Sequence, residues 1–196
     1  DYAVVGRNRR TAYLDGTSAM YGKTGVPEFS HVEGYEDHSV NVLATYSESG
    51  TMTGVIVNVP SPSQVTEQLF RISADYWHET RIELRRRHGD SLFVLPQCSA
   101  AGDQSPRPQF EKQANERMLE LRKRSLREEI GVRIADAVDN VLPAVHQTAE
   151  AHIALRHRAE TLALPLNAIT EDHVREALAE AGKLQAVYEE EKANLE

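Results

Sequence analysis

Residues 92–110, LFVLPQCSAAGDQSPRPQF, decide the fold that we expect for this chain. The apolar run 92–95 is typical of a short buried strand, and a helical pattern opens near Phe110. The loop between them holds Gly102 and Ser105 in the sequence Gly-Asp-Gln-Ser-Pro. Such a turn commonly presents a nucleophile, because glycine tolerates a positive φ and the next helix directs free N–H groups at developing negative charge. Ser105 is therefore the candidate nucleophile, and the open alternative is a polar loop without chemistry.

The segments on either side of this stretch predict an α/β fold, with a mixed β-sheet and helices packed on it. We expect strands at 2–5, 11–14, 40–44, 54–59, 92–95 and 152–164, and helices at 74–87, from 110, at 126–141 and from 170. Strands 40–44 and 54–59 should form a hairpin. Ser73 and Thr170 are expected to cap the helices that follow them, and Pro143 should end another.

One segment, residues 16–36, resists assignment to a helix or a strand. It contains four glycines and a proline, and we expect it to be a long irregular segment. Segments of this kind are often functional. It leads into a dense polar stretch that includes His31 and His38.

Composition limits the class of protein. The chain has 196 residues, of which 40% are hydrophobic, and this is enough for one domain with a sizeable core over residues 1–196. The formal net charge of −8 argues against a nucleic-acid surface. No apolar run approaches the roughly 20 residues of a membrane-spanning helix. The chain begins without an initiator Met, so we expect it to be part of a longer protein.

Four stretches of the sequence resemble one known family. Residues 6–14, GRNRRTAYL, are similar to its "NRSP-AYL" segment, and residues 54–59, GVIVNV, to the apolar strand before its second zinc histidine. Residues 72–75, ISAD, are similar to its "ISxD" helix start, and residues 102–106 to its active-site hexapeptide Gly-Asp-Val-Ser-Pro-Asn. The family is that of the neutral/alkaline, non-lysosomal ceramidases, in their N-terminal catalytic domain. The likeness is to a divergent bacterial branch.

The resemblance implies an amidohydrolase that uses zinc to polarise an amide carbonyl and to lower the pKa of a bound water. Two histidines, a glutamate and a tyrosine hold the zinc in that family, and the hexapeptide serine, on which Ser105 falls, works beside it. We accordingly assign Ser105, Asp103 and Gly102 to catalysis, and Arg107, Gln104 and Asn8 to substrate binding. The implied substrate is a small-molecule or lipid amide, and the implied location is secreted or periplasmic.

The chain departs from the family at its zinc site. The first zinc histidine belongs to a Thr-His-Thr-His-like segment upstream of the stretch that residues 6–14 match. The second should follow residues 54–59, where Pro60, Ser61 and Pro62 stand. Arg107 replaces the asparagine of the hexapeptide. The family's zinc site therefore cannot be assembled from this sequence.

Another set of residues could take over the metal or supply a base. His31 and His38 lie just before a predicted strand, and Asp75 and His78 share a helical face at a spacing of three. Imidazole and carboxylate together suit zinc, or a serine with histidine as base and aspartate as orienter. The open alternative is that the histidines are loop and surface residues.

Two classes of function remain. The first is a metal-dependent, ceramidase-like amidohydrolase that cleaves an N-acyl bond with Ser105 at its site. The second is a non-catalytic or incomplete α/β domain that keeps the scaffold without the zinc site and acts in binding or assembly. The missing zinc histidines favour the second class, and the Gly-Asp-Gln-Ser-Pro loop favours the first.

Overall fold

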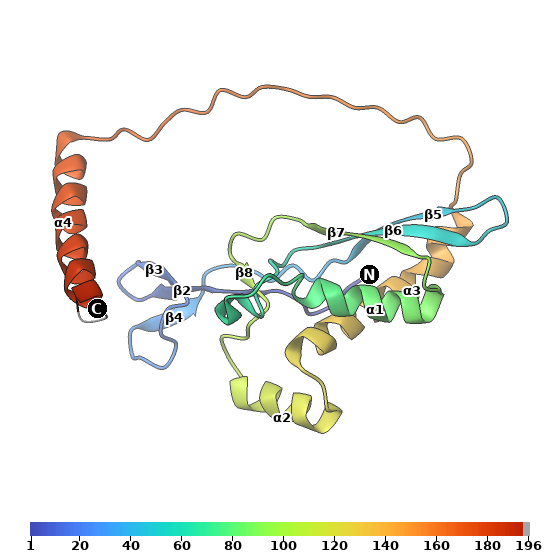
Figure 1. The fold of residues 1–196 in the computed structure, drawn as a ribbon, viewed down its shortest axis with the longest axis horizontal. Coiled ribbons are helices and arrows are strands. Elements are labelled where there is room, and N and C mark those ends of the chain that lie inside the picture. Colours follow the sequence, from blue (N-terminus) through green and yellow to red (C-terminus); the bar gives the residue numbers. More distant parts are fainter. Residues whose placement is uncertain (194–196) are drawn as a thin grey trace. The chain divides into compact units, whose positions relative to one another are not determined.

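The computed structural model describes residues 1–193, and the chain divides into two compact units, Asp1–Ala151 and His152–Glu196. Over the described residues the protein is mixed α/β, with three small sheets and four α-helices (Figure 1). The α/β class is confirmed. The single mixed sheet that we expected is wrong, because the strands form three separate sheets.

The principal sheet has the order β5-β6-β7. Strands β5 (Asn41–Tyr46) and β6 (Met52–Val59) form the predicted hairpin, closed by a turn in which Gly50 has a φ of 79°. Strand β7 (Phe93–Cys98) lies parallel to β6. A parallel pair needs a crossover connection, and α1 (Tyr76–His88) supplies it.

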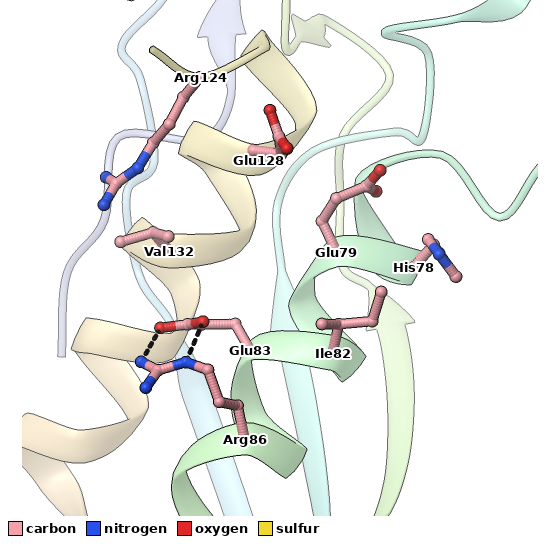
Figure 2. Close-up of a pocket in the computed structure, with 8 residues that line it drawn as sticks. All are labelled: His78, Glu79, Ile82, Glu83, Arg86, Arg124, Glu128 and Val132. Atoms are coloured by element: carbon pink, nitrogen blue, oxygen red, sulfur yellow. Dashed lines mark hydrogen bonds and ion pairs between the residues drawn. The ribbon is translucent and has the colours of Figure 1, made fainter. Parts of the chain in front are cut away.

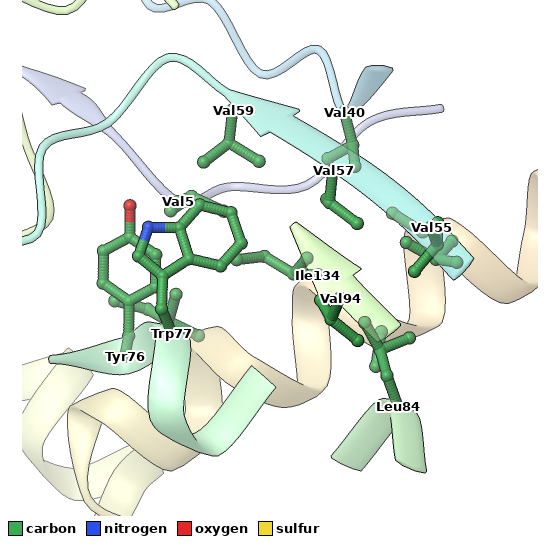
Figure 3. Close-up of a cluster of buried hydrophobic side chains, with 14 of the residues drawn as sticks. Val5, Val40, Val55, Val57, Val59, Tyr76, Trp77, Leu84, Val94 and Ile134 are labelled. Carbon is green, nitrogen blue, oxygen red and sulfur yellow. The ribbon is translucent and has the colours of Figure 1, made fainter. Parts of the chain in front are cut away.

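A hydrophobic core fills the space between this sheet, α1 and the long helix α3 (Leu126–Gln147). Figure 3 shows valines of the strands directed at aromatic and aliphatic side chains of the helices. The buried residues of this core include Val55, Val57, Val59, Val94, Tyr76, Trp77, Leu84, Ile130, Ile134 and Val138. The sequence pattern of residues 74–87 predicts Trp77 and Leu84 on the inner face of the helix, and their burial in the core confirms this. Strand β7 buries only one face, since Val94 is 4% exposed and Phe93 is 62% exposed, so a fully buried strand at 92–95 was wrong.

Two smaller sheets lie in the same unit. Strands β1 (Arg7–Asn8) and β8 (Gln104–Ser105) form an antiparallel pair. Strands β3 (Ser18–Met20), β2 (Arg10–Tyr13) and β4 (Phe29–Val32) form the third sheet in that order. The segment 16–36 is therefore not wholly irregular. A turn at Gly16, with a φ of 82°, reverses the chain from β2 into β3.

The helix ends differ from the prediction in two places. Helix α1 is capped by Asp75 rather than by Ser73, whose hydroxyl accepts from the backbone N–H of Asp75 instead. Helix α3 continues through Pro143 to Gln147. The proline removes one backbone hydrogen bond, but its neighbour Leu142 packs against the core, and this contact favours continuation of the helix.

Helix α2 (Lys112–Arg122) has no buried residue. The second unit contains helix α4 (Glu171–Ala193), and the hydroxyl of Thr170 accepts from the backbone N–H of His173 at 3.3 Å, which confirms Thr170 as its cap. The strand predicted at 152–164 is wrong, because those residues form no strand and their side chains are exposed. Among residues 1–193, no helix combines the length and the apolar character needed to cross a membrane.

Candidate functional site

Ser105 lies on β8, where it pairs with Arg7 of β1. It is completely buried, and its hydroxyl oxygen accepts from the phenol of Tyr21 and from the backbone N–H of Arg107, each at 3.2 Å. These contacts hold the hydroxyl between segments that lie far apart in the sequence. Ser105 is therefore buried inside the protein, whereas the loop pattern predicted that it would be presented at the surface.

Arg9 extends this arrangement. Its guanidinium donates to the Tyr21 phenol oxygen at 3.1 Å and to the carbonyl of Gly102 at 2.9 Å. It also lies 5.3 Å from the centre of the Tyr21 ring. The Nε of Arg9 is buried without a hydrogen-bond partner among the described residues. We call Arg9, Tyr21 and Ser105, with the Arg107 backbone N–H, the serine cluster.

Tyr21 was missed by the sequence interpretation. Its backbone has a φ of 54°, in the left-handed region that a tyrosine rarely adopts. Backbone strain of this kind tends to gather at functional positions, because the surrounding structure must maintain it. The only sequence signal was its place in the glycine-rich segment 16–36, and Arg9 was visible only as part of a basic run.

The other predicted loop residues face a different way. Successive side chains of a strand alternate between faces, so Gln104 lies on the opposite face of β8 from Ser105. There, Asp103 accepts from the side-chain amide of Asn8 at 2.9 Å and from that of Gln104 at 3.1 Å. The Oε1 of Gln104 is buried without a partner among the described residues. The proposed catalytic and substrate-binding residues are thus divided between two faces.

Arg107 connects the loop to the segment before α1. Its guanidinium donates to the carbonyl of Val65 at 3.2 Å and pairs with Glu67 at 3.4 Å. Only its backbone N–H reaches Ser105. The side chain predicted to bind substrate therefore holds two protein segments together.

The predicted histidine and aspartate set does not assemble. His31 lies on β4, exposed, beside the hydroxyl of Ser30 at 2.9 Å. His38 pairs with Glu36 at 3.4 Å. The carboxylate of Asp75 accepts from the backbone N–H groups of Tyr76 and Thr66 and from the Thr66 hydroxyl, each at 2.8 Å, because it caps α1.

These contacts decide whether a zinc ion fits. Both oxygens of Asp75 are already engaged by hydrogen-bond donors. Within residues 1–193, no three His, Cys, Asp or Glu side chains are grouped so that they could hold a metal ion. Among the described residues, His31, His38, Asp75 and His78 therefore do not come together as a zinc site. Within the described part of the chain, the Ser105 hydroxyl bonds to Tyr21 and to the Arg107 backbone and to no imidazole or carboxylate, so a Ser-His-Asp triad is not assembled there either.

His78 lies at one end of a cavity of about 470 Å³ between α1 and α3, and Arg124 lies at the other end (Figure 2). Glu79, Glu83 and Glu128 line this cavity. Hydrogen bonds from Arg86, helped by Arg87, lower the pKa of Glu83 to about 2. Glu79 pairs with Arg127 and so links α1 to α3, whereas the arginine partners of Glu83 lie within α1 itself.

A second cavity, of about 380 Å³, lies where the β5–β6 turn meets α3. The ring of His146 lies edge-on to Tyr46, with centres 5.0 Å apart. The Nε2 of His88 lies 2.7 Å from Asp139, which also pairs with Arg87. Both histidines therefore connect secondary-structure elements: His88 joins α1 to α3, and His146 joins α3 to β5.

Comparisons with protein families, with curated proteins and with solved structures return no match for this chain.

Proposed function

We propose that this chain carries the serine cluster of a hydrolase that cleaves an N-acyl amide bond. The observation that carries the proposal is the contact of the Ser105 hydroxyl with Tyr21 and with the Arg107 backbone N–H, beside the unpaired Nε of Arg9. An unpaired, buried guanidinium N–H is suited to an amide carbonyl oxygen, and it would stabilise the charge that develops there. The resemblance of residues 102–106 to the ceramidase hexapeptide supports the same reaction.

Access to Ser105 would depend on Tyr21. The Tyr21 side chain is 44% exposed while Ser105 has no exposed surface. Rotation of this one exposed ring would break the hydrogen bond at 3.2 Å and open a path toward the serine. Exposed side chains change rotamer on the picosecond-to-nanosecond timescale, and Tyr21 is not part of the hydrophobic core, so such an opening needs no rearrangement of the core.

Arg9 and Tyr21 have different roles in the proposed reaction. Arg9 would bind the carbonyl oxygen through its free Nε, and Tyr21 would orient the Ser105 hydroxyl. The lipid or small-molecule nature of the amide comes from the family resemblance alone. A metal, if one takes part, is not assigned to His31, His38, Asp75 or His78, because these residues do not fit it.

The test measures fatty-acid release by the purified chain from N-acylsphingosine and from a short-chain N-acyl amide, with and without added zinc. Ser105→Ala should lower the rate at least 100-fold, because it removes the attacking hydroxyl, and Tyr21→Phe about tenfold, because it removes the phenol that orients this hydroxyl. Ser99→Ala, in the same loop, is the matched control and should leave the rate unchanged. Equal rates for folded Ser105→Ala and the unmodified chain would refute the proposal.

The second candidate is a non-catalytic module that binds an amide without cleaving it. It is favoured by one observation, that the buried Ser105 hydroxyl has neither an imidazole nor a carboxylate among its partners in residues 1–193. A serine without a base is a weak nucleophile. Binding of a fluorescent N-acyl amide, lost in Arg9→Gln, together with no hydrolysis by the unmodified chain, would establish this candidate in place of the first.

A further inference from the structure

Helix α4 carries an uncovered apolar stripe. The helix has 23 residues, and none of its side chains is buried. Val174, Leu178, Leu184 and Tyr188 are between 48% and 68% exposed, and with Ala181 they lie along one face at steps of three and four residues. Most of the stability of a helix in a protein comes from packing of its apolar face, so this stripe is suited to a partner surface.

The charge of α4 disfavours two kinds of partner. The helix has seven acidic and three basic residues. Helices that lie on membranes usually carry Lys and Arg on their polar face, because lipid surfaces are anionic. Nucleic acid is disfavoured for the same reason. The partner should therefore be a protein surface with its own apolar stripe.

On each flank of the stripe, a basic and an acidic residue lie at equal distances before and after Gly182 in the sequence. Arg175 and Glu189 lie seven residues before and after it, on the same flank of the stripe. His173 and Glu191 lie nine residues before and after it, on the other flank. When two such helices run antiparallel, Arg175 faces the partner's Glu189 and His173 faces the partner's Glu191 on both sides.

A parallel arrangement lacks this complementarity. It would bring the acidic run 189–191 of one copy beside the same run of the other, and like charges at close range repel. Arg175 bonds to Asp172 within its own helix, but both side chains are well exposed, and such surface pairs are weak. Arg175 is therefore free to engage a second carboxylate.

We propose that α4 is a self-association surface, and that a second copy of this chain covers its stripe in an antiparallel helical pair. Ala181, near the middle of the stripe, allows the two backbones to approach closely. The surface lies in the second unit and is independent of the serine cluster.

The first test is sedimentation equilibrium of the full chain over a range of concentrations. The unmodified chain should dimerise, and Leu178→Glu with Leu184→Glu should weaken dimerisation at least 100-fold, because two charges would enter the apolar seam. The thermal transition of residues 1–151 should not change. A monomer at all concentrations, a dimer insensitive to this double variant, or binding of the monomer to phosphatidylserine vesicles would each overturn the proposal.

The second test addresses the antiparallel direction. Arg175→Glu and Glu189→Arg should each weaken the dimer about threefold to tenfold, and the two together should restore it, since the opposite charges would again face each other. Glu190→Arg makes the same charge change on the outward side of the helix and should have little effect. Failure of the combined variant to restore association would overturn the antiparallel register.

Discussion

The hydrophobic core and the serine cluster both contain fully buried residues, but different forces hold them. Val57 and Leu84 are buried among other apolar side chains, and the stabilising term is the removal of apolar surface from water. Ser105 is buried equally well among hydrogen-bonding groups. An apolar contact can be lost in part, whereas a buried polar group that loses its partner keeps its full desolvation cost.

The same contrast recurs in helix α3, which has a buried glutamate beside its apolar face. The Glu129 side chain has no exposed surface and accepts from Arg133 at 2.9 Å, from Arg124 at 3.2 Å and from Arg122. Burial by itself would raise the pKa of Glu129, but these guanidiniums outweigh it and hold the pKa below its usual value. Like the buried hydroxyl of Ser105, the buried carboxylate of Glu129 is held by hydrogen-bond donors, and in this case the donors are also charged.

The largest effect should come from Glu129→Gln. Removal of the carboxylate charge leaves three partly exposed arginines without their shared partner, and breaking such a pair at its buried member costs up to about 3–5 kcal/mol. Urea denaturation at pH 7 measures the loss. Glu128→Gln is the control on the neighbouring residue, which is largely exposed, and it should cost less than about 1 kcal/mol. Equal losses for both variants would show that burial of Glu129 does not matter.

Acid should remove the same stabilisation. The pKa of Glu129 is lower in the folded chain than its usual value of 4.5, so the unfolded chain takes up the proton first as the pH falls. The contribution is complete above pH 4.5 and declines as the pH falls toward the folded pKa. The difference in stability between the unmodified chain and Glu129→Gln should therefore shrink from pH 7 to pH 3. A difference that grows in acid would contradict this pKa shift.

Leu84→Ala should produce the next largest effect, about 3 kcal/mol. Leu84 is fully buried between α1 and the sheet, and truncation leaves a cavity in addition to the lost apolar contact. Ile82→Ala, on the exposed side of the same helix, should change stability by less than about 0.5 kcal/mol. Thermal denaturation of both variants measures the contrast, and a small loss for Leu84→Ala would mean that the core relaxes around the gap.

The core was largely predictable from the sequence, and the serine cluster was not. The hairpin, and the inward positions of Trp77 and Leu84, follow from local periodicity and turn signals. Ser105 was found from its loop, but Tyr21 is separated from it by 84 residues. Local patterns do not say which distant segments will meet.

The same cause limits the predicted metal set. His31, His38 and His78 were grouped because their elements might have ended at one sheet edge, but His31 lies on β4, His78 lies on α1, and residues 1–193 contain no metal-binding group of three side chains. The strand predicted at 152–164 rested on apolar alternation alone. Alternation makes a strand only where a neighbouring strand supplies hydrogen bonds and cover.

A smaller effect should distinguish the predicted helix cap from the observed one. Asp75→Ala should cost about 2 kcal/mol, because the carboxylate accepts the capping bond from Tyr76 and two bonds from Thr66. Ser73→Ala removes one acceptor in an exposed region and should cost about 0.5 kcal/mol. The midpoint of urea denaturation separates the two variants, and the reverse order would restore Ser73 as the cap.

Ser105→Ala should cost less stability than Glu129→Gln, Leu84→Ala or Asp75→Ala, although its predicted effect on hydrolysis is the largest. The change removes one hydrogen-bond acceptor and costs about 1 kcal/mol, since the exposed Tyr21 hydroxyl can turn to water and only the Arg107 N–H loses its partner. A double-mutant cycle with Tyr21→Phe, followed by urea denaturation, should give a coupling of about 0.5 kcal/mol or more. A loss near 3 kcal/mol would place Ser105 with Leu84 as a structural residue and would favour the binding module over the hydrolase.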